Sequence, residues 1–462
     1  MLSRLFAVFL LGAAGARAQA PPKFVPLDIA ALGPHGEAVP DLRAGEIELL
    51  DNKKPQSIAY WHANNLRTKV PSAMLVVLDL QSTPIKSAGW NEAVQAMRRL
   101  EASEYVYLYA VTNGGVLLPV HPLPEAGGDS ALVNSPWMDP VLPQFESAAR
   151  LYQPRHAGVS DYSQYAELAA RLADFSGRKS LVCAGCLLIP EKLDPNLQAP
   201  VADGDVLVNR AVQVFLEARV AVYVVDGLKR SRYPAGMLEA GESLVFANHV
   251  GGFAEVTGGR TYTQGEIGQA IAQAANDGRS SYRLAYLPGT ENWDGKRHPL
   301  KIVCRRAGVR ILAPAWYRAD RWEDMVRERP APIPDSLIKN PFDEPDISIS
   351  VAPPQKKADG MRITVRVNAA DLLLFPQGGR YTGRLDLQAL CYMADGRKQA
   401  CTEPVRVDLD LSEAEHETAI RGGLQFPIDL TADKAGSKIR VVVHDANSGA
   451  SGSHTFSIGA VQ

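Results

Sequence analysis

Three side chains that can offer oxygen ligands, Asp79, Gln81 and Thr83, alternate along one short segment of the chain. Residues 74–78 just before them form an unbroken apolar run, which is typical of a parallel strand buried on both faces. Asp79 therefore places a carboxylate at the carboxyl end of that strand, where open α/β sheets bind ligands. Because Mg²⁺ prefers oxygen ligands, the segment is a candidate cation site. In the alternative interpretation, Asp79 caps a loop or helix through hydrogen bonds.

Cys183 and Cys186 form a C-x-x-C motif at the end of another predicted strand. Redox enzymes place the first cysteine of such a motif at a helix N-terminus, which lowers the pKa of its thiol. Here the motif begins inside a predicted buried strand, and no thioredoxin-like pattern surrounds it. This position favours a local structural disulfide or two buried thiols over a catalytic dithiol.

Cys391 and Cys401 flank a turn at residues 394–397, Ala-Asp-Gly-Arg. A hairpin there would set the two cysteines opposite each other on adjacent strands, within reach of a disulfide. Since five cysteines cannot all pair within one chain, we expect Cys304 to remain an unpaired thiol, buried in its strand.

The composition and the missing motifs argue against several classes of function. The formal net charge is −2, which leaves no electrostatic footprint for nucleic acid or an anionic membrane. The histidines show no metal-ligand spacing, and no G-x-S-x-G elbow, P-loop or G-x-G-x-x-G occurs between a predicted strand and helix. We therefore expect a protein that is not an enzyme and needs no cofactor.

Residues 1–20 have the features of a secretory signal. Arg4 provides the positive charge, residues 5–12 are apolar, and small residues follow, with cleavage expected after Ala18 or Ala20. The apolar segment is too short to cross a bilayer, no second span follows, and no cysteine is placed to carry a lipid anchor. The sequence thus predicts a periplasmic or extracellular protein without a transmembrane anchor, in a compartment that permits disulfides.

Two segments far apart in the sequence share the pattern of antiparallel strands. Residues 22–67 alternate apolar and polar residues between turns, but they are too few for a core of their own. Residues 280–317 return to the same pattern. We expect the two segments to pair as a small β-sandwich, with an α/β unit inserted between them.

Residues 70–278 alternate short strands with longer helices, which favours an α/β, doubly wound and mostly parallel sheet. Strands are predicted at 73–79, 104–111, 179–184, 219–225 and 260–263, and helices near 87–101, 163–175, 205–218, 244–257 and 266–276. Asn113-Gly-Gly115 predicts a turn that adds an antiparallel strand at one edge of this sheet.

The last part of the chain is predicted to be a separate unit. Residues 322–346 are rich in proline and charge, as expected of a stiff, extended connector. Residues 347–462 contain about seven short alternating strands and no helical period, which predicts a C-terminal all-β sandwich domain.

The order of these segments resembles the von Willebrand factor A-type family, and in particular secreted VWFA-related proteins of the kind found in Acidobacteria-like bacteria. The segments that carry the resemblance are 36–40, 47–56, 78–84, 166–182, 218–226, 257–260, 282–288 and 315–318. It rests on their order over most of the chain, because no single segment is specific. The resemblance implies the fold described above, which here we call vWA-like.

The resemblance also implies a metal-ion-dependent adhesion site, and this chain departs from its pattern. Family members often bind Mg²⁺ through an Asp-x-Ser-x-Ser loop, a Thr from a second loop and an Asp from a third. Here Asp79 matches the first position, Gln81 replaces the first Ser, and Thr83 retains a hydroxyl. The second loop offers Ser160, Asp161 and Ser163 without a clear Thr, and residues 180–186 contain no carboxylate, although Asp226 on another strand could supply one. The site is therefore predicted to be degenerate.

These observations predict a non-enzymatic scaffold that binds a protein partner through the carboxyl edge of its parallel sheet. One alternative is an envelope thiol–disulfide enzyme that uses Cys183 and Cys186. The other is an adhesion-type binder that depends on Mg²⁺ at Asp79.

Overall fold

The computed structural model describes most of the chain after the predicted signal. The described residues are 24–64, 72–80, 82–112, 116–124, 136–148, 162–173, 175, 177–185, 212–225, 254–262, 265–289, 292–321, 333–334, 337–338, 343–358, 360–392, 398–431 and 438–457. Several predictions fall outside this set: the signal segment, Gln81, the turn at 113–115, residues 160–161, Cys186, Asp226, the turn at 394–397 and most of the connector. Ser163 lies in a described helix, but its side chain is outside the description.

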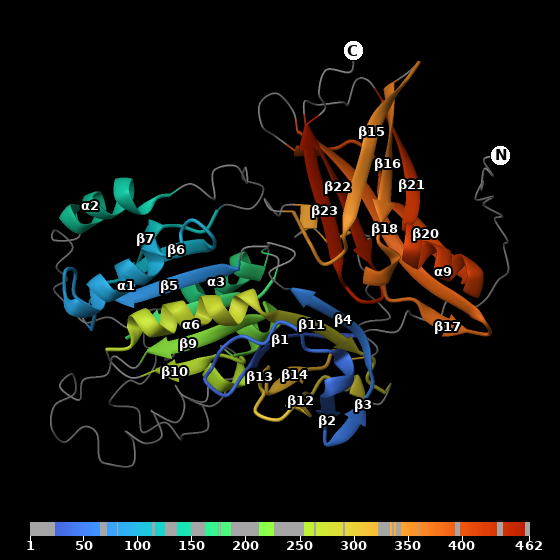
Figure 1. Ribbon diagram of the computed structural model, residues 1–462. Helices are drawn as coiled ribbons and strands as arrows, with labels where there is room; N and C mark the ends of the chain where they lie inside the picture. The colour runs from blue at the N-terminus through green and yellow to red at the C-terminus, as the bar shows by residue number, and fades with distance from the viewer. Residues whose placement is uncertain are drawn as a thin grey trace.

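β5 (Ala73–Asp79) lies inside a six-stranded sheet with the order β10–β9–β8–β5–β6–β7 (Figure 1). It runs parallel to β6 (Tyr105–Val111) on one side and to β8 (Lys179–Ala184) on the other. β9 (Val220–Val225) and β10 (Arg260–Tyr262) continue the parallel sheet, and β7 (Leu117–His121) closes the other edge antiparallel to β6. The chain is therefore a mixed α/β protein, as the sequence predicted.

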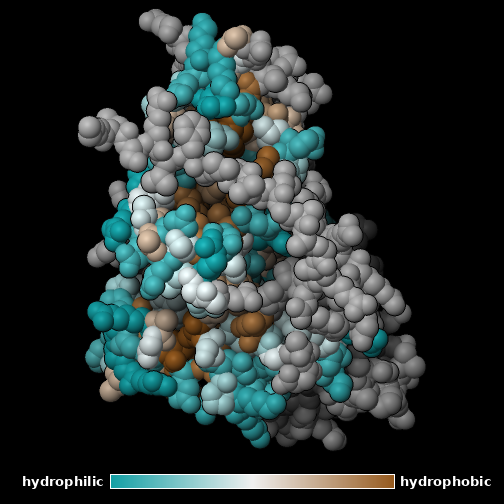
Figure 2. All heavy atoms as spheres, turned by 90° about the vertical axis from the view of Figure 1, so that its right-hand side faces the viewer, coloured by the Kyte–Doolittle hydropathy of each residue, from teal (hydrophilic) through white to brown (hydrophobic). Residues whose placement is uncertain are grey.

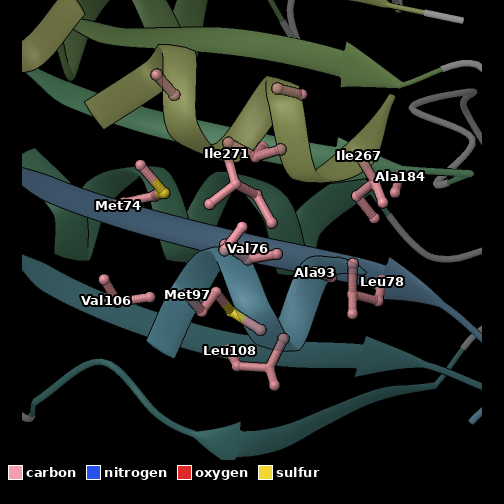
Figure 3. Close-up of a cluster of buried hydrophobic side chains, with 14 of the residues drawn as sticks. Met74, Val76, Leu78, Ala93, Met97, Val106, Leu108, Ala184, Ile267 and Ile271 are labelled. Atoms are coloured by element: carbon pink, nitrogen blue, oxygen red, sulfur yellow. The ribbon is translucent and has the colours of Figure 1, made fainter. Parts of the chain in front are cut away.

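Helices cover both faces of this sheet because the side chains of each strand alternate between them. Met74, Val76 and Leu78 pack against α1 (Ala88–Arg98) and α6 (Ile267–Arg279), as Figure 3 shows. Leu75 and Val77 face α3 (Tyr162–Ala173) and a helical turn at 212–217. Beside β7 lies α2 (Met138–Ala148), a helix that the sequence did not predict, with Pro143 inside it.

The N-terminal strands and the strands after α6 form two facing antiparallel sheets. One has the order β13–β1–β11–β4 and the other β14–β12–β2–β3. Their bounds are β1 Val25–Leu32, β2 Ile47–Asp51, β3 Lys54–Gln56, β4 Ile58–Asn64, β11 Ser281–Tyr286, β12 Arg297–Cys304, β13 Arg310–Leu312 and β14 Trp316–Arg318, with a 3₁₀ turn, η1, at Ala44–Glu46. A shared apolar core lies between the two sheets, with Ile29 and Leu284 from one and Leu49 from the other. The N-terminal strands thus share a hydrophobic core with the strands that follow the inserted α/β unit, because β1 pairs with β11 and β2 with β12.

The hairpin between β2 and β3 has a two-residue turn with positive φ at both positions, Asn52 at 50° and Lys53 at 66°. This type I′ turn suits the twist of a hairpin, and Asn-Gly is its preferred sequence. We expect Lys53→Gly to stabilise the protein by about 0.5–1 kcal/mol, because Lys53 pays a steric cost in the left-handed region. Thermal unfolding would measure the gain. Lys54→Gly, one residue later in extended β3, should instead lower the melting temperature, and equal effects of the two changes would contradict this account of the turn.

The C-terminal part contains a three-stranded sheet, β15–β16–β21, and a larger sheet in which β18 pairs with β17, β19, β20 and β22, and β22 with β23. The bounds are β15 Ile349–Lys357, β16 Gly360–Val367, β17 Phe375–Gln377, β18 Arg380–Tyr392, β19 Lys398–Ala400, β20 Val405–Ser412, β21 Leu424–Thr431, β22 Lys438–Asp445 and β23 Ser451–Ser457, with a 3₁₀ turn, η6, at Ala369–Asp371. Val365 from the first sheet and Leu387 and Val441 from the second share one core. Across β18 and the end of β19, a disulfide joins Cys391 and Cys401, whose Cα atoms are 5.5 Å apart.

The expectation that this part contains only strands is wrong, because α9 (Glu413–Gly422) connects β20 to β21 (Figure 1). Ser412 begins the helix with a capping box: its hydroxyl accepts from the Glu415 amide, and the Glu415 carboxylate accepts from the Ser412 amide at 2.8 Å. The pattern Ser-x-x-Glu was visible in the sequence. The apolar periodicity was weak because Ala419 is the only side chain of α9 that becomes buried.

On the face drawn in Figure 2, hydrophilic residues cover most of the described surface, and hydrophobic residues gather in separate smaller areas. None of the helices within the described ranges is both long and apolar enough to span a bilayer.

Candidate functional site

Asp79 ends β5 with its side chain buried and held from the following loop. Ser82 Oγ donates to Asp79 Oδ2 at 3.1 Å, and the Thr83 amide donates to the Asp79 carbonyl at 2.7 Å. Thr83 is itself buried beside the start of α1, where its methyl group packs near Gly89. The sequence pointed to Asp79, Gln81 and Thr83 on alternate positions, but the hydroxyl that reaches the carboxylate comes from Ser82. The hydrogen bonds match the interpretation of Asp79 as a residue that organises its loop.

The end of β8 closes over the same carboxylate. Gly185 follows β8 with φ at +68°, and a Cβ on it would lie 1.7 Å from Ser82 Oγ and 3.4 Å from Asp79 Cβ. No side chain, and therefore no carboxylate, fits at position 185 without displacing Ser82. The close approach explains in physical terms why the residue after Ala184 is glycine.

The described residues around Asp79 do not form a set of ligands for a divalent cation. Among them, the Ser82 hydroxyl donates its proton to the Asp79 carboxylate. Across the described residues, no group of three His, Cys, Asp or Glu side chains is close enough to hold a metal ion. A site for Mg²⁺ needs several oxygen ligands in an octahedral array, so we assign no metal-dependent step to this edge.

The carboxyl edge continues from Asp79 to an exposed apolar residue. Asp79, Val111 and Leu117 are in register across β5, β6 and β7, and the Leu80 amide donates to the Val111 carbonyl at 2.9 Å. Val116, next to Leu117, is 54% exposed, the highest value among the exposed large hydrophobic residues of the described chain. The segments that follow β8 and β9 also leave the sheet from this edge.

Cys183 lies within β8 and is fully buried and disulfide-bonded, whereas its motif partner Cys186 is outside the described residues. It pairs in register with Val77 and Val224 on the neighbouring strands. This strand position differs from the helix N-terminus that activates redox cysteines. Cys304 is a free thiol, as expected, but it is half-buried rather than enclosed in its strand.

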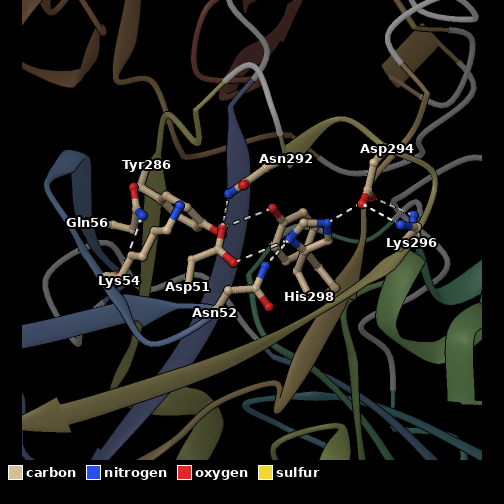
Figure 4. Close-up of polar contacts among 10 residues, drawn as sticks. Asp51, Asn52, Lys54, Gln56, Tyr286, Asn292, Asp294, Lys296 and His298 are labelled. Atoms are coloured by element: carbon tan, nitrogen blue, oxygen red, sulfur yellow. Dashed lines mark hydrogen bonds and ion pairs between the residues drawn. The ribbon is translucent and has the colours of Figure 1, made fainter.

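A second polar cluster, which the sequence did not indicate, surrounds Asp51 inside the β-sandwich (Figure 4). The carboxylate is fully buried, and its Oδ2 accepts from Tyr286 Oη at 2.9 Å, Asn292 Nδ2 at 2.9 Å and Tyr317 Oη at 3.0 Å. Its Oδ1 has no hydrogen bond within the described residues and lies 3.6 Å from His298 Nδ1. The cluster joins β2, β11 and β14 to the loop before β12.

His298 completes this cluster and connects it to the surface. With its proton on Nε2, it donates to Asp294 Oδ1 at 3.0 Å, and its Nδ1 accepts from Asn52 Nδ2 at 2.6 Å. Hydrogen bonds from His298 and from the Lys296 amide hold the pKa of Asp294 below its usual range. Each side chain of the cluster makes a hydrogen bond to another, and the ring of His298 is buried, so the arrangement suits structural support better than proton transfer to a substrate.

A third cluster, the ionic hub, consists of Asp28, Lys179, Arg219, Arg283, Glu344 and Asp346. Arg283 of β11 is at its centre: its Nε donates to Asp28 Oδ1 at 2.9 Å, and its guanidinium forms an ion pair with Asp346. Arg219 Nη1 lies 3.7 Å from Asp28 Oδ2. The hub joins the β-sandwich, the amino ends of β8 and β9, and the segment that enters the C-terminal strands.

Burial and charge act against each other in the ionic hub. Burial alone would raise the pKa of Asp28, but the cationic groups of Arg283, Arg219 and Lys179 lower it well below its usual range. Burial, together with the charge of Arg219, lowers the pKa of Lys179, and burial raises that of Glu344. Glu344 and Asp346, at the end of the predicted connector, are therefore part of a buried cluster of charges and do not belong to an exposed linker.

Sequence reasoning missed both clusters because their members are far apart in the chain. Arg283 is 255 residues from Asp28, and His298 is 246 residues from Asn52. The local sequence indicated these clusters only through charged residues inside otherwise apolar strands, such as Asp28 in β1 and Arg283 in β11. A charged residue at a strand position that the pattern assigns to the core needs a buried partner.

Comparisons with known proteins give no close relative. No family model matches the chain, and no curated protein matches it. Among solved structures, a von Willebrand factor type A protein from Catenulispora acidiphila is 10% identical, with a TM-score of 0.27, over 96% of this chain and 74% of that one. The human COPII-coat protein Sec24c is also 10% identical, with a TM-score of 0.28, over 84% of this chain and 43% of that one. At these TM-scores the fold is argued from the strand order and register of this chain alone.

Proposed function

We propose that this protein is a non-enzymatic scaffold that binds a protein partner through the carboxyl edge of its parallel sheet. The observation that carries the proposal is the edge itself. It contains a carboxylate closed off by Ser82 and Gly185 and, two strands away and next to β7, the exposed apolar Val116. An edge with an exposed apolar side chain, and without a metal-binding cluster among its described residues, is suited to protein contact.

The resemblance to von Willebrand factor A-type proteins supports the same function. The observed strand order, with β5 between β6 and β8 and an antiparallel edge strand, agrees with that family's fold. The degenerate loop around Asp79 leads us to propose binding without Mg²⁺. A place outside the cytoplasm fits the disulfide between Cys391 and Cys401, since such bonds persist in oxidising compartments.

We expect Val116→Asp to abolish capture of the partner from an extract of the periplasm and envelope. A charge at an apolar contact leaves an unpaired carboxylate in the interface, which costs on the order of 2 kcal/mol or more. The measurement is quantitative mass spectrometry of the proteins retained by immobilised wild type and variant.

Val303→Asp is the matched control, because Val303 is 40% exposed on β12, in the β-sandwich. It should retain the same proteins as wild type. Equal retention by wild type, Val116→Asp and Val303→Asp would show that this edge is not the binding surface.

The two alternatives make different predictions for the same protein. A Mg²⁺-dependent binder would release heat on titration with Mg²⁺ and lose it in Asp79→Ala, whereas we expect no difference between the two. A thiol–disulfide enzyme would reduce or oxidise a test peptide and lose that activity in Cys183→Ser. The burial of Cys183 in the middle of a sheet opposes this function.

A further inference from the structure

A cavity of about 600 Å³ lies where the β10 edge of the parallel sheet meets the β13 edge of the sandwich. Its walls come from β10, β13, α6 and the loop before β2, and its main polar side chains are His35, Arg260, Tyr262, Gln269, Gln273 and Arg310. At one end the two units touch, because a Cβ on Gly258 would lie 3.0 Å from the Ala313 carbonyl carbon. A cavity of this size suits a small molecule rather than a single ion.

The cavity wall is rich in hydrogen-bond donors. Arg260 Nη2 donates to Asp277 Oδ1 at 3.0 Å, but its Nε has no partner among the described residues. The hydroxyl of Tyr262, a residue 91% buried, also lacks a described partner. Burial raises the pKa of Tyr262 to about 12, so this hydroxyl keeps its proton as a donor at neutral pH. A buried donor without a partner costs about 1–3 kcal/mol. Both atoms are shielded by the wall, so a ligand oxygen recovers this cost only when the wall side chains shift to admit it.

The charge of the wall is also favourable to an anion. Arg310 on β13 is exposed, and no described carboxylate forms an ion pair with it. Glu255 is the acidic residue among those that line the cavity. Asp277 is buried, forms an ion pair with Arg260, and also interacts electrostatically with the buried Arg178. Two guanidinium groups, those of Arg260 and Arg310, thus line the cavity beside one carboxylate, that of Glu255.

We infer that this cavity binds a small anionic molecule, whose phosphate or carboxylate group lies between Arg260 and Arg310. Guanidinium groups bind both kinds of oxyanion through paired N–H donors. The hydroxyl of Tyr262 is a further donor, buried behind the same wall. β9, β8 and β5 separate β10 from β6 in the sheet order, so this site is distinct from the proposed protein-binding edge and does not depend on it.

Calorimetric titration of the full chain with inorganic phosphate, and separately with succinate, tests this site. We expect wild type to bind at least one of the two anions, and Arg310→Gln to weaken that binding by about tenfold or more. Tyr262→Phe should weaken it by a smaller factor, because its hydroxyl is buried and is not exposed in the cavity. The anion that binds more tightly identifies the oxyanion group of the ligand.

Arg305→Gln is the control, since Arg305 is an exposed arginine on the same sandwich that does not line the cavity. It should bind the anion as wild type does. The inference is overturned if wild type binds neither anion, or if Arg310→Gln binds as tightly as Arg305→Gln.

Discussion

Replacement of Arg283 by methionine should destabilise the protein by about 3–5 kcal/mol, the typical cost of removing one partner from a buried ion pair. Arg283 is 3% exposed, and its guanidinium contacts both Asp28 and Asp346, which are buried as well. Methionine fills much of the same space but leaves Asp346 without its ion-pair partner and Asp28 with the more distant cation of Arg219. The shift of the urea unfolding midpoint would measure the loss.

Arg362→Met is the matched control for this prediction. Arg362 also makes a bidentate ion pair, with Asp429, at 2.6 Å for each bond, but this pair lies on the exposed surface of β16 and β21. Solvent screens such a pair, so its removal should change stability far less. If the two variants lose the same stability, the ionic hub does not hold the three parts of the chain together.

Asp51→Ala should destabilise the β-sandwich by about 3–5 kcal/mol, because it leaves several buried donors without an acceptor at once. The hydroxyl groups of Tyr286 and Tyr317 and the amide of Asn292 all donate to one oxygen of Asp51. Burial, with the neighbouring phenol and Asp51, raises the pKa of Tyr286, so its hydroxyl remains protonated and needs an acceptor. Thermal unfolding monitored by tyrosine fluorescence would report the change.

Two further variants distinguish the contribution of the Asp51 carboxylate to stability from that of a single donor. Asp51→Asn keeps one oxygen for the three donors, so it should lose less than half as much stability as Asp51→Ala. Tyr317→Phe removes one donor and should cost about 1 kcal/mol. An Asp51→Ala variant no less stable than Tyr317→Phe would contradict the role given to this cluster.

The central parallel sheet could be predicted because its signal is local. The apolar run before Asp79 and the alternation of short strands with helices depend on residues close together in the chain, and β5, β8 and β9 lie within a residue of their predicted bounds. The same holds for the strand residues of the sandwich, whose alternation reflects one buried face. α9 escaped prediction because Ala419 is its only buried side chain, so that its apolar periodicity is weak. α2 keeps helical spacing at Met138, Val141, Leu142 and Phe145, but Pro143 inside it argued against a helix.

The polar sites were less predictable because they depend on which strands become neighbours. Asp79 was found because its position after a buried strand carries meaning by itself. That Ser82 hydrogen-bonds to it depends on the path of the loop, which the sequence pattern did not predict. The cavity at Arg260 and Arg310 exists only because the edges of two separate sheets meet there. No spacing along the chain relates residues brought together in this way.

The most direct test of the proposed protein-binding edge is to map where a captured partner is cross-linked. Lys86 follows β5 at this edge and its side chain is 58% exposed, whereas Lys301 and Lys357 are exposed on the β-sandwich and the C-terminal strands. With an amine-reactive cross-linker and chelator present throughout, we predict partner cross-links at Lys86, and their loss in Val116→Asp. Cross-links at Lys301 or Lys357, with none at Lys86, would contradict the account.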